Sequence, residues 1–167
     1  MKQIGDLEID QDLDFQKREW IVERVSWFVG LAIIILGLLG LFGTGPISST
    51  TAGDANGPIS VDYQRFVRHN GEMSLTMTVA PDQVQDGQVE LWISATILDK
   101  VDLQQFSHEP DEVRNEGDRT VFVFLTGDTP GQLTITVNMR SHVFGRIAGD
   151  IGIVDGSQVS ISQLSYP

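Results

Sequence analysis

The hydrophobic positions of this chain follow two patterns, one continuous and one alternating. The nineteen residues 25–43 contain no ionisable side chain, whereas from residue 59 onward apolar and polar residues alternate in short runs. A helix of nineteen residues rises about 28 Å, close to the roughly 30 Å hydrocarbon thickness of a bilayer. The continuous pattern therefore predicts a transmembrane helix, and the alternating pattern predicts half-buried β-strands.

The alternation is regular enough to place individual strands. Its clearest run alternates Met73, Leu75, Met77 and Val79 with serine and threonine, and similar runs cover residues 59–63, 89–93, 121–125, 133–139, 151–153 and 159–161. Turn-forming pairs such as Asn70-Gly71, Asp86-Gly87 and Asp155-Gly156 separate these runs. The spacing predicts an all-β domain, specifically an immunoglobulin-like β-sandwich of about seven to eight antiparallel strands.

These patterns divide the chain into four parts. We expect an acidic cytoplasmic tail over residues 1–14, a juxtamembrane and transmembrane helix over 15–43, a flexible linker over 44–58 and the extracytoplasmic β-sandwich domain over 59–167. The tail is either disordered or a docking segment that orders against a cytoplasmic partner. The linker is rich in Gly, Ser, Thr, Ala and Pro, and at a reach of about 50 Å it would not hold the domain near the membrane.

Charged and aromatic residues beside the span predict its orientation and its retention. Lys17, Arg18 and Arg24 precede the span, and no basic residue follows it until Arg65, so the N-terminus is expected in the cytoplasm and the domain outside it. The segment before the span is long and acidic, and Pro46 follows the one plausible cleavage pattern. This favours an uncleaved signal anchor over a removable signal.

Two sets of residues on the predicted helix are candidate contact sites. Trp20, Arg24 and Trp27 are predicted to lie at the membrane interface, and the four-residue spacing of Trp20 and Arg24 allows the guanidinium to cover the indole. A second set falls within about 100° of helical arc and forms a small-residue stripe: Ser26, Gly30, Gly37 and Gly40. The stripe predicts packing against other transmembrane helices, although glycine is also frequent in membrane helices without that role.

Composition excludes several classes of function. The formal net charge is −12, from 11 basic and 23 acidic residues, so the surface repels phosphate backbones and anionic headgroups alike, and nucleic acid is not an expected partner. The lipid bilayer is an expected partner because of the apolar span. The chain has no cysteine, which removes disulfides, thiolate metal sites and cysteine nucleophiles.

Two groups of residues have side chains that metals bind, and each has a simpler interpretation. His108, Glu109, Asp111 and Glu112 read as a solvated acidic loop. The copper-type set is His69, Met73, Met77, Met139 and His142, but its methionines alternate in phase with core positions. Since the chain also lacks the Gly-x-Ser-x-Gly, Gly-x-Gly-x-x-Gly and His-Glu-x-x-His motifs, we predict no catalytic residue, cofactor or metal.

Four short motifs resemble a family. They are Trp20-x-x-Glu23-Arg24-Val25, Phe42-Gly-x-Gly-Pro-Ile-Ser48, Val61-Asp-Tyr-Gln-Arg-Phe66 and the terminal Tyr166-Pro167. Together they resemble a group of small, uncharacterised, single-pass bacterial inner-membrane proteins with a short cytoplasmic tail and an exported β domain. The resemblance implies a location and no activity.

Two functions remain open from the sequence. The chain is either a non-catalytic accessory, structural or assembly subunit of a bacterial membrane complex, such as a photosynthetic or respiratory one, or a tethered extracytoplasmic module that binds copper or a small ligand.

Overall fold

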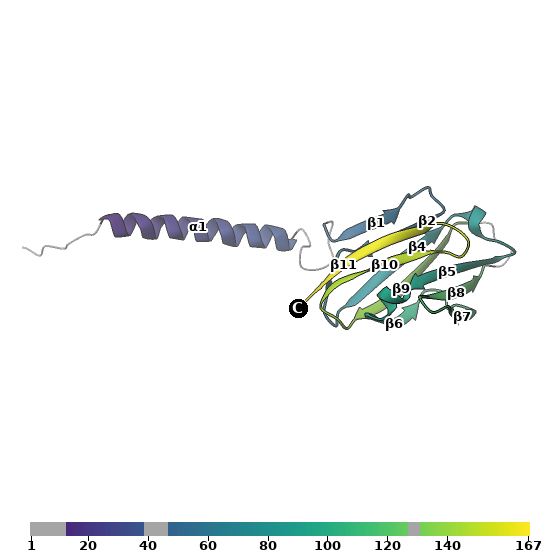
Figure 1. Cartoon of the computed structure of the whole chain (residues 1–167). Coiled ribbons are helices and arrows are strands. Elements are labelled where there is room, and N and C mark those ends of the chain that lie inside the picture. Colours follow the sequence, from purple (N-terminus) through teal and green to yellow (C-terminus); the bar gives the residue numbers. More distant parts are fainter. Residues whose placement is uncertain (1–12, 39–46, 127–130) are drawn as a thin grey trace, which may run out of the picture. The chain divides into compact units, whose positions relative to one another are not determined.

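The structure is a computed structural model that describes residues 13–38, 47–126 and 131–167. The chain divides into two compact units, Met1–Leu38 and Leu39–Pro167. The first unit contains one long helix and the second contains a β-sandwich (Figure 1). Residues 1–12 of the expected tail, Gly40 and the end of the expected span lie outside the described residues, whereas Leu13 and Asp14 belong to the helix.

Helix α1 (Leu13–Leu38) is continuous through the charged segment before the apolar run. Its 21-residue stretch Arg18–Leu38 has a mean hydropathy of 2.0, and its length and composition suit it to cross a membrane. All side chains from residue 18 to residue 38 are exposed except for Gly30 and Gly37, which are half-buried. Within the first unit, no other described residue covers this apolar surface.

The second unit is a sandwich of two β-sheets, as the alternating pattern predicts. The five-stranded sheet has the order β1 (Ser49–Gly53), β2 (Ile59–Gln64), β4 (Glu72–Val79), β9 (Leu133–Ser141) and β6 (Val101–Phe106). The six-stranded sheet has the order β3 (Phe66–Arg68), β11 (Gln158–Tyr166), β10 (Gly145–Ile153), β5 (Gln88–Ser94), β8 (Arg119–Leu125) and β7 (Glu112–Asn115). Two short helices, η1 (Pro81–Gln83) and α2 (Ala95–Leu98), flank β5 in the sequence.

The expected number of strands was wrong, and one strand pair departs from the expected antiparallel direction. The described residues form eleven strands instead of seven to eight, and β3 runs parallel to β11. The strand orders also differ from the four-plus-three arrangement of an immunoglobulin constant domain. The additional strands include β3 and β7, which have three and four residues. Strands this short give too few positions for an alternating pattern to be recognised.

The expected flexible linker contains a strand. Strand β1 lies inside residues 44–58 and pairs with all but one residue of β2, from Ser49↔Gln64 to Gly53↔Ser60. Its sequence, STTAG, has no large apolar residue, so the segment has the composition of a linker. Backbone hydrogen bonds to β2, the hydrogen bond from Thr51 to Asp62 and packing of Ala52 on the core stabilise it instead.

The inner faces of the two sheets form one hydrophobic core. The alternating residues of β4 and β9 point into it, and Met73, Met77 and Met139 are at most 2% exposed. Their burial confirms the core interpretation of these methionines. The predicted turns are confirmed by positive φ values at Asn70, Asp86 and Asp155.

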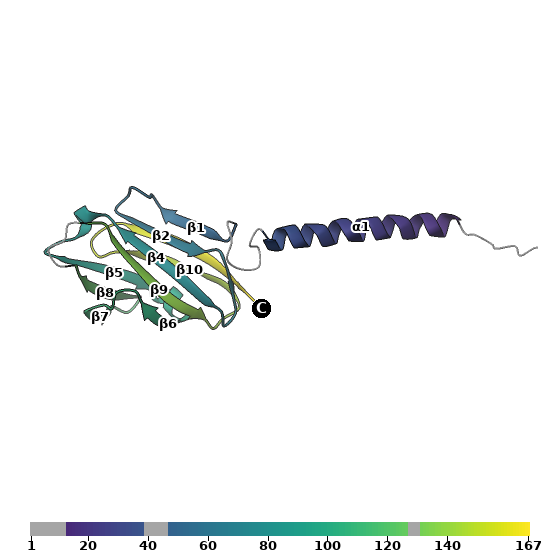
Figure 2. The same ribbon diagram turned by 180° about the vertical axis from the view of Figure 1, so that it is seen from behind.

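The strand directions define two ends of the sandwich. The proximal end is the end at which β1 begins. It also contains the β3–β4 and β9–β10 turns, the start of β6 and the end of β11, where Figures 1 and 2 mark the C-terminus. The distal end contains the β1–β2, β4–β5 and β10–β11 connections. Residues that are far apart in the sequence therefore meet at each end.

Candidate functional site

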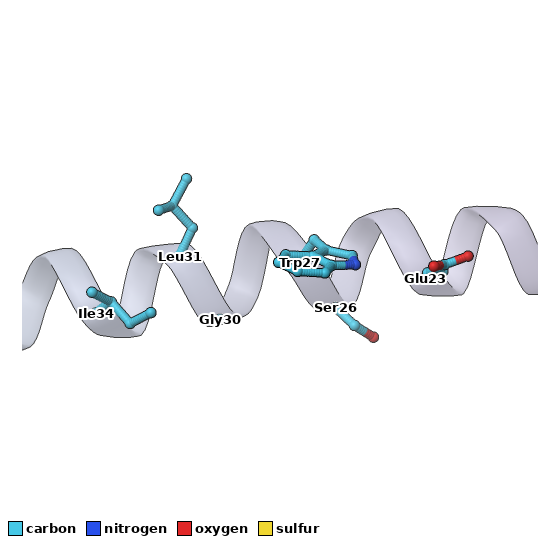
Figure 3. Close-up of a pocket in the computed structure, with 6 residues that line it drawn as sticks. All are labelled: Glu23, Ser26, Trp27, Gly30, Leu31 and Ile34. Carbon is cyan, nitrogen blue, oxygen red and sulfur yellow. The ribbon is translucent and has the colours of Figure 1, made fainter.

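A groove on α1 surrounds two residues of the predicted small-residue stripe. Its volume is about 340 Å³, and its lining consists of Glu23, Ser26, Trp27, Gly30, Leu31 and Ile34. Figure 3 shows the helix ribbon bare at Gly30, between the side chains of Trp27 and Ile34. A Cβ atom added to Gly30 would meet no heavy atom within 4 Å, apart from the local backbone of the helix. The missing side chain is thus what opens the groove.

The chemistry of this groove suits close packing rather than catalysis. The Ser26 hydroxyl donates to the carbonyl of Val22 over 2.8 Å, so its hydrogen-bond requirement is met inside the helix. The remaining lining is mostly apolar, and small residues at such a site let two helix backbones approach closely in lipid. Gly37 is half-buried, and Gly40 lies outside the described residues.

Two of the three predicted membrane-interface residues stack on each other, and the third, Trp27, lines the groove. The Arg24 guanidinium lies over the Trp20 ring, with its central carbon 3.6 Å from the ring centroid. This is the stacking that their four-residue spacing allows. Trp27 is 75% exposed, so its indole is free to face lipid or another protein.

The candidate copper ligands do not converge. Their methionine sulfur atoms belong to core residues, whereas His142 is exposed and His69 stacks on Phe144 with 3.8 Å between ring centroids. Nδ1 of His69 is buried without a hydrogen-bond partner. The described residues contain no group of three or more His, Asp and Glu side chains suited to hold a metal ion. The acidic loop at residues 108–112 is not such a group either.

The closest approach of a histidine to a carboxylate is at the surface. Nδ1 of His142 lies 3.7 Å from Oδ1 of Asp102, and the two side chains are 41% and 62% exposed. Nε2 of the same ring lies 3.1 Å from the carbonyl oxygen of Asp99. Because a carbonyl only accepts hydrogen bonds, Nε2 carries a proton in this geometry. In the neutral ring Nδ1 is then the nitrogen without a proton, and it lies beside the Asp102 carboxylate at an exposed surface rather than in a cleft.

A polar depression on the outer face of the five-stranded sheet was not predicted. It has a volume of about 300 Å³ and is lined by Ser49, Thr50, Thr51, Asp62, Tyr63, Gln64, Ser74 and Thr76. The hydroxyls of Thr76 and Thr136 lie 3.1 Å apart on neighbouring strands. The alternating serines and threonines of β4 indicated a polar outer face, but the depression depends on β1, which composition alone did not reveal.

Comparison with known proteins gives little further information. No protein-family model matches the chain, and no curated protein matches it. Among solved structures, it is similar to a cohesin module from a family 33 glycoside hydrolase of Clostridium perfringens. The TM-score is 0.43 at 12% sequence identity, over 70% of this chain and 98% of that module. At this level, the similarity carries no argument about ligands or partners.

Proposed function

We propose that this protein is a non-catalytic accessory or assembly subunit of a bacterial membrane complex, with α1 as its binding element. In this proposal α1 spans the inner membrane, the N-terminus is cytoplasmic and the sandwich lies on the exported side. Photosynthetic and respiratory complexes are the two candidate types. The observation that carries the proposal is the groove at Gly30 on an otherwise exposed apolar helix.

The physical argument begins with the exposure of α1. A 26-residue helix whose apolar side chains are exposed is stable only where lipid or another helix covers them. Helix association in lipid depends on close van der Waals packing, because lipid tails are as apolar as the side chains. Ser26 and Gly30 provide a surface for close packing, while the larger Trp27 and Ile34 border it.

The charged and aromatic residues support an anchor with the N-terminus inside. Arg18 and Arg24 lie at the N-terminal side of the apolar stretch, and Trp20 stacks on Arg24 there. Tryptophan and arginine are typical of the interfacial region, and basic residues favour the cytoplasmic side. Pro46 disfavours cleavage after the span, so the helix is proposed to remain attached.

A tethered binding module is the second candidate. The polar depression between β1, β2 and β4 favours it, because hydroxyl and carboxylate groups there face solvent and suit a polar small ligand. The Thr51 hydroxyl already bonds to Asp62, which reduces the number of groups free to bind a ligand. For this reason we place the subunit function first.

The test is a pair of substitutions on opposite faces of α1. Gly30→Leu fills the groove, whereas Ala32→Leu adds a similar side chain about 200° away around the helix. We expect Gly30→Leu to abolish stoichiometric co-purification with the membrane partner in mild detergent, while Ala32→Leu leaves it intact. Leucine favours helix by about 1 kcal/mol over glycine, so unfolding of α1 would not explain the loss. Unchanged association of the Gly30→Leu protein would refute the proposal.

A further inference from the structure

We infer that the proximal end of the sandwich binds the anionic headgroup layer of the membrane that α1 spans. This inference rests on the proposed span. It concerns a different surface, made by the β3–β4 and β9–β10 turns and the end of β11. Three features support it: a short connection, a separation of charge within the sandwich, and exposed apolar side chains at the same end.

The connection to the sandwich is much shorter than its composition suggested. The first described residue of the second unit is Ile47, and Ser48 is already fully buried. The predicted apolar span ends at Gly43, so only residues 44–46 separate it from Ile47. Three residues reach at most about 11 Å. The point at which the chain enters the sandwich is therefore tethered close to the headgroup layer.

Charge within the sandwich is distributed unequally between the ends. The proximal segments 65–72, 99–102 and 140–146 contain five basic and three acidic residues. The distal segments 54–58, 80–87 and 154–157 contain four aspartates and no basic residue. Residues 47–167 carry seven basic and sixteen acidic residues in total. An anionic surface therefore repels the sandwich as a whole but attracts its proximal end.

Three proximal arginines retain their charge for an external partner. Arg65 donates to the Thr50 hydroxyl over 3.0 Å, and Arg146 donates to the Ser162 hydroxyl over the same distance. Neither these two nor Arg68 has an ion-pair partner within 4.0 Å among the residues that the structure describes. All three are exposed. Neutral hydroxyl partners leave the positive charge available to lipid phosphates.

Exposed apolar side chains lie beside these arginines. Phe144, in the β9–β10 turn, is 62% exposed, and one face of its ring stacks on the His69 ring. Leu164 is 47% exposed and pairs directly with Arg146 on the neighbouring strand, so both point to the outer face of the sheet. An aromatic residue beside cations suits the membrane interface, where apolar rings and phosphates lie at similar depths.

The absence of cysteine allows a direct test on the full-length chain in lipid nanodiscs. A fluorophore is attached through Pro167→Cys at the proximal end or through Ser157→Cys at the distal end. The discs contain a headgroup-attached quencher and consist of either phosphatidylglycerol-rich or pure phosphatidylcholine lipid. We expect strong quenching at position 167 in anionic discs, weaker quenching there in neutral discs, and little quenching at position 157.

A matched pair of charge variants tests the arginines. The variant Arg65→Gln, Arg68→Gln, Arg146→Gln removes three positive charges from the proximal end, and the control Asn56→Asp, Gln85→Glu, Ser157→Glu makes the same net change at the distal end. Each arginine at the surface raises the population in contact roughly fivefold. We therefore expect the first variant to remove the difference between anionic and neutral discs at position 167, while the control preserves it.

The outcomes separate this inference from the proposed span. If the protein fails to incorporate into discs, both the span and the inference are wrong. If the protein incorporates but position 157 is quenched as strongly as position 167, the headgroup inference alone is overturned. The same holds if quenching at position 167 is unchanged by the charge of the lipid and by removal of the three arginines. If the proximal end binds a protein partner instead of lipid, quenching at position 167 will not depend on lipid charge, because the discs contain no such partner.

Discussion

Ser141 on β9 and Ser165 on β11 join the two sheets through a buried hydrogen bond, with 3.1 Å between their Oγ atoms. The Ser141 Oγ also lies 3.1 Å from the carbonyl oxygen of Val143. Ser141 is the donor in both contacts, so its one hydrogen is shared between the Ser165 hydroxyl and the Val143 carbonyl. The pair fixes the β9–β10 turn against the C-terminal strand at the proximal end.

The two serines are predicted to differ in their contribution to stability. Ser141→Ala leaves both the Val143 carbonyl and the Ser165 hydroxyl without a partner, at a cost of about 1–3 kcal/mol, whereas Ser165→Ala removes one acceptor and costs about 1 kcal/mol. The double variant should cost less than the sum. Urea unfolding of the full-length protein in detergent measures all three. A larger cost for Ser165→Ala than for Ser141→Ala contradicts the assignment of both hydrogen bonds to Ser141.

Gly149 on β10 lies beneath α2 at a distance that excludes a side chain. A Cβ atom there would lie 2.5 Å from Oγ1 of Thr96 and 2.8 Å from Cγ1 of Ile97. Gly149→Ala should therefore destabilise the sandwich by about 1–3 kcal/mol through overpacking. Gly131→Ala is the control, since a Cβ atom at Gly131 meets nothing within 4 Å. Thermal unfolding compares the two, and equal melting temperatures would show that α2 yields to the added methyl group.

The proposed orientation predicts which end of the chain is accessible from outside. In cells with a permeabilised outer membrane, a membrane-impermeant maleimide should label Ser157→Cys before lysis, and Gln3→Cys only after it. Both variants should remain in the membrane pellet after alkaline carbonate extraction. Labelling of position 3 before lysis would reverse the topology, and release by carbonate would indicate that α1 does not anchor the protein.

Copper is predicted to leave the sandwich unaffected. Met73, Met77 and Met139 are core residues, and the ring of His69 stacks on Phe144, so binding would require the core to open. We expect copper(I) to leave the melting temperature unchanged. Calorimetric titration provides an independent measurement. A stabilising shift that disappears in Met73→Leu would restore the metal-binding hypothesis.

The sequence predicted the parts of the fold whose signal is local. Strands β4 and β9 alternate over eight and nine residues, so their inner faces and the burial of Met77 followed from a period of two. Strand β1 escaped prediction because its stability comes from pairing with β2 rather than from large apolar side chains. The eleven-strand architecture depends on such pairings between distant segments, and these pairings cannot be predicted from composition.

The same distinction applies to the candidate surfaces. Ser26 and Gly30 are four residues apart on one helix, so their proximity was visible in the sequence. Arg68 and Arg146 are 78 positions apart and become neighbours of β11 only through the strand order of the six-stranded sheet. The charge separation between the two ends could therefore be recognised only once the strand order was known.

The burial of the sandwich methionines has a chemical consequence. Met73, Met77 and Met139 are at most 2% exposed, and the chain has no cysteine. Oxidation of methionine to its sulfoxide, like oxidation of a thiol, requires access to sulfur. The described part of the sandwich presents no accessible sulfur to peroxide or to disulfide-exchanging enzymes. These agents are therefore expected to leave the described part of the sandwich unmodified while it remains folded.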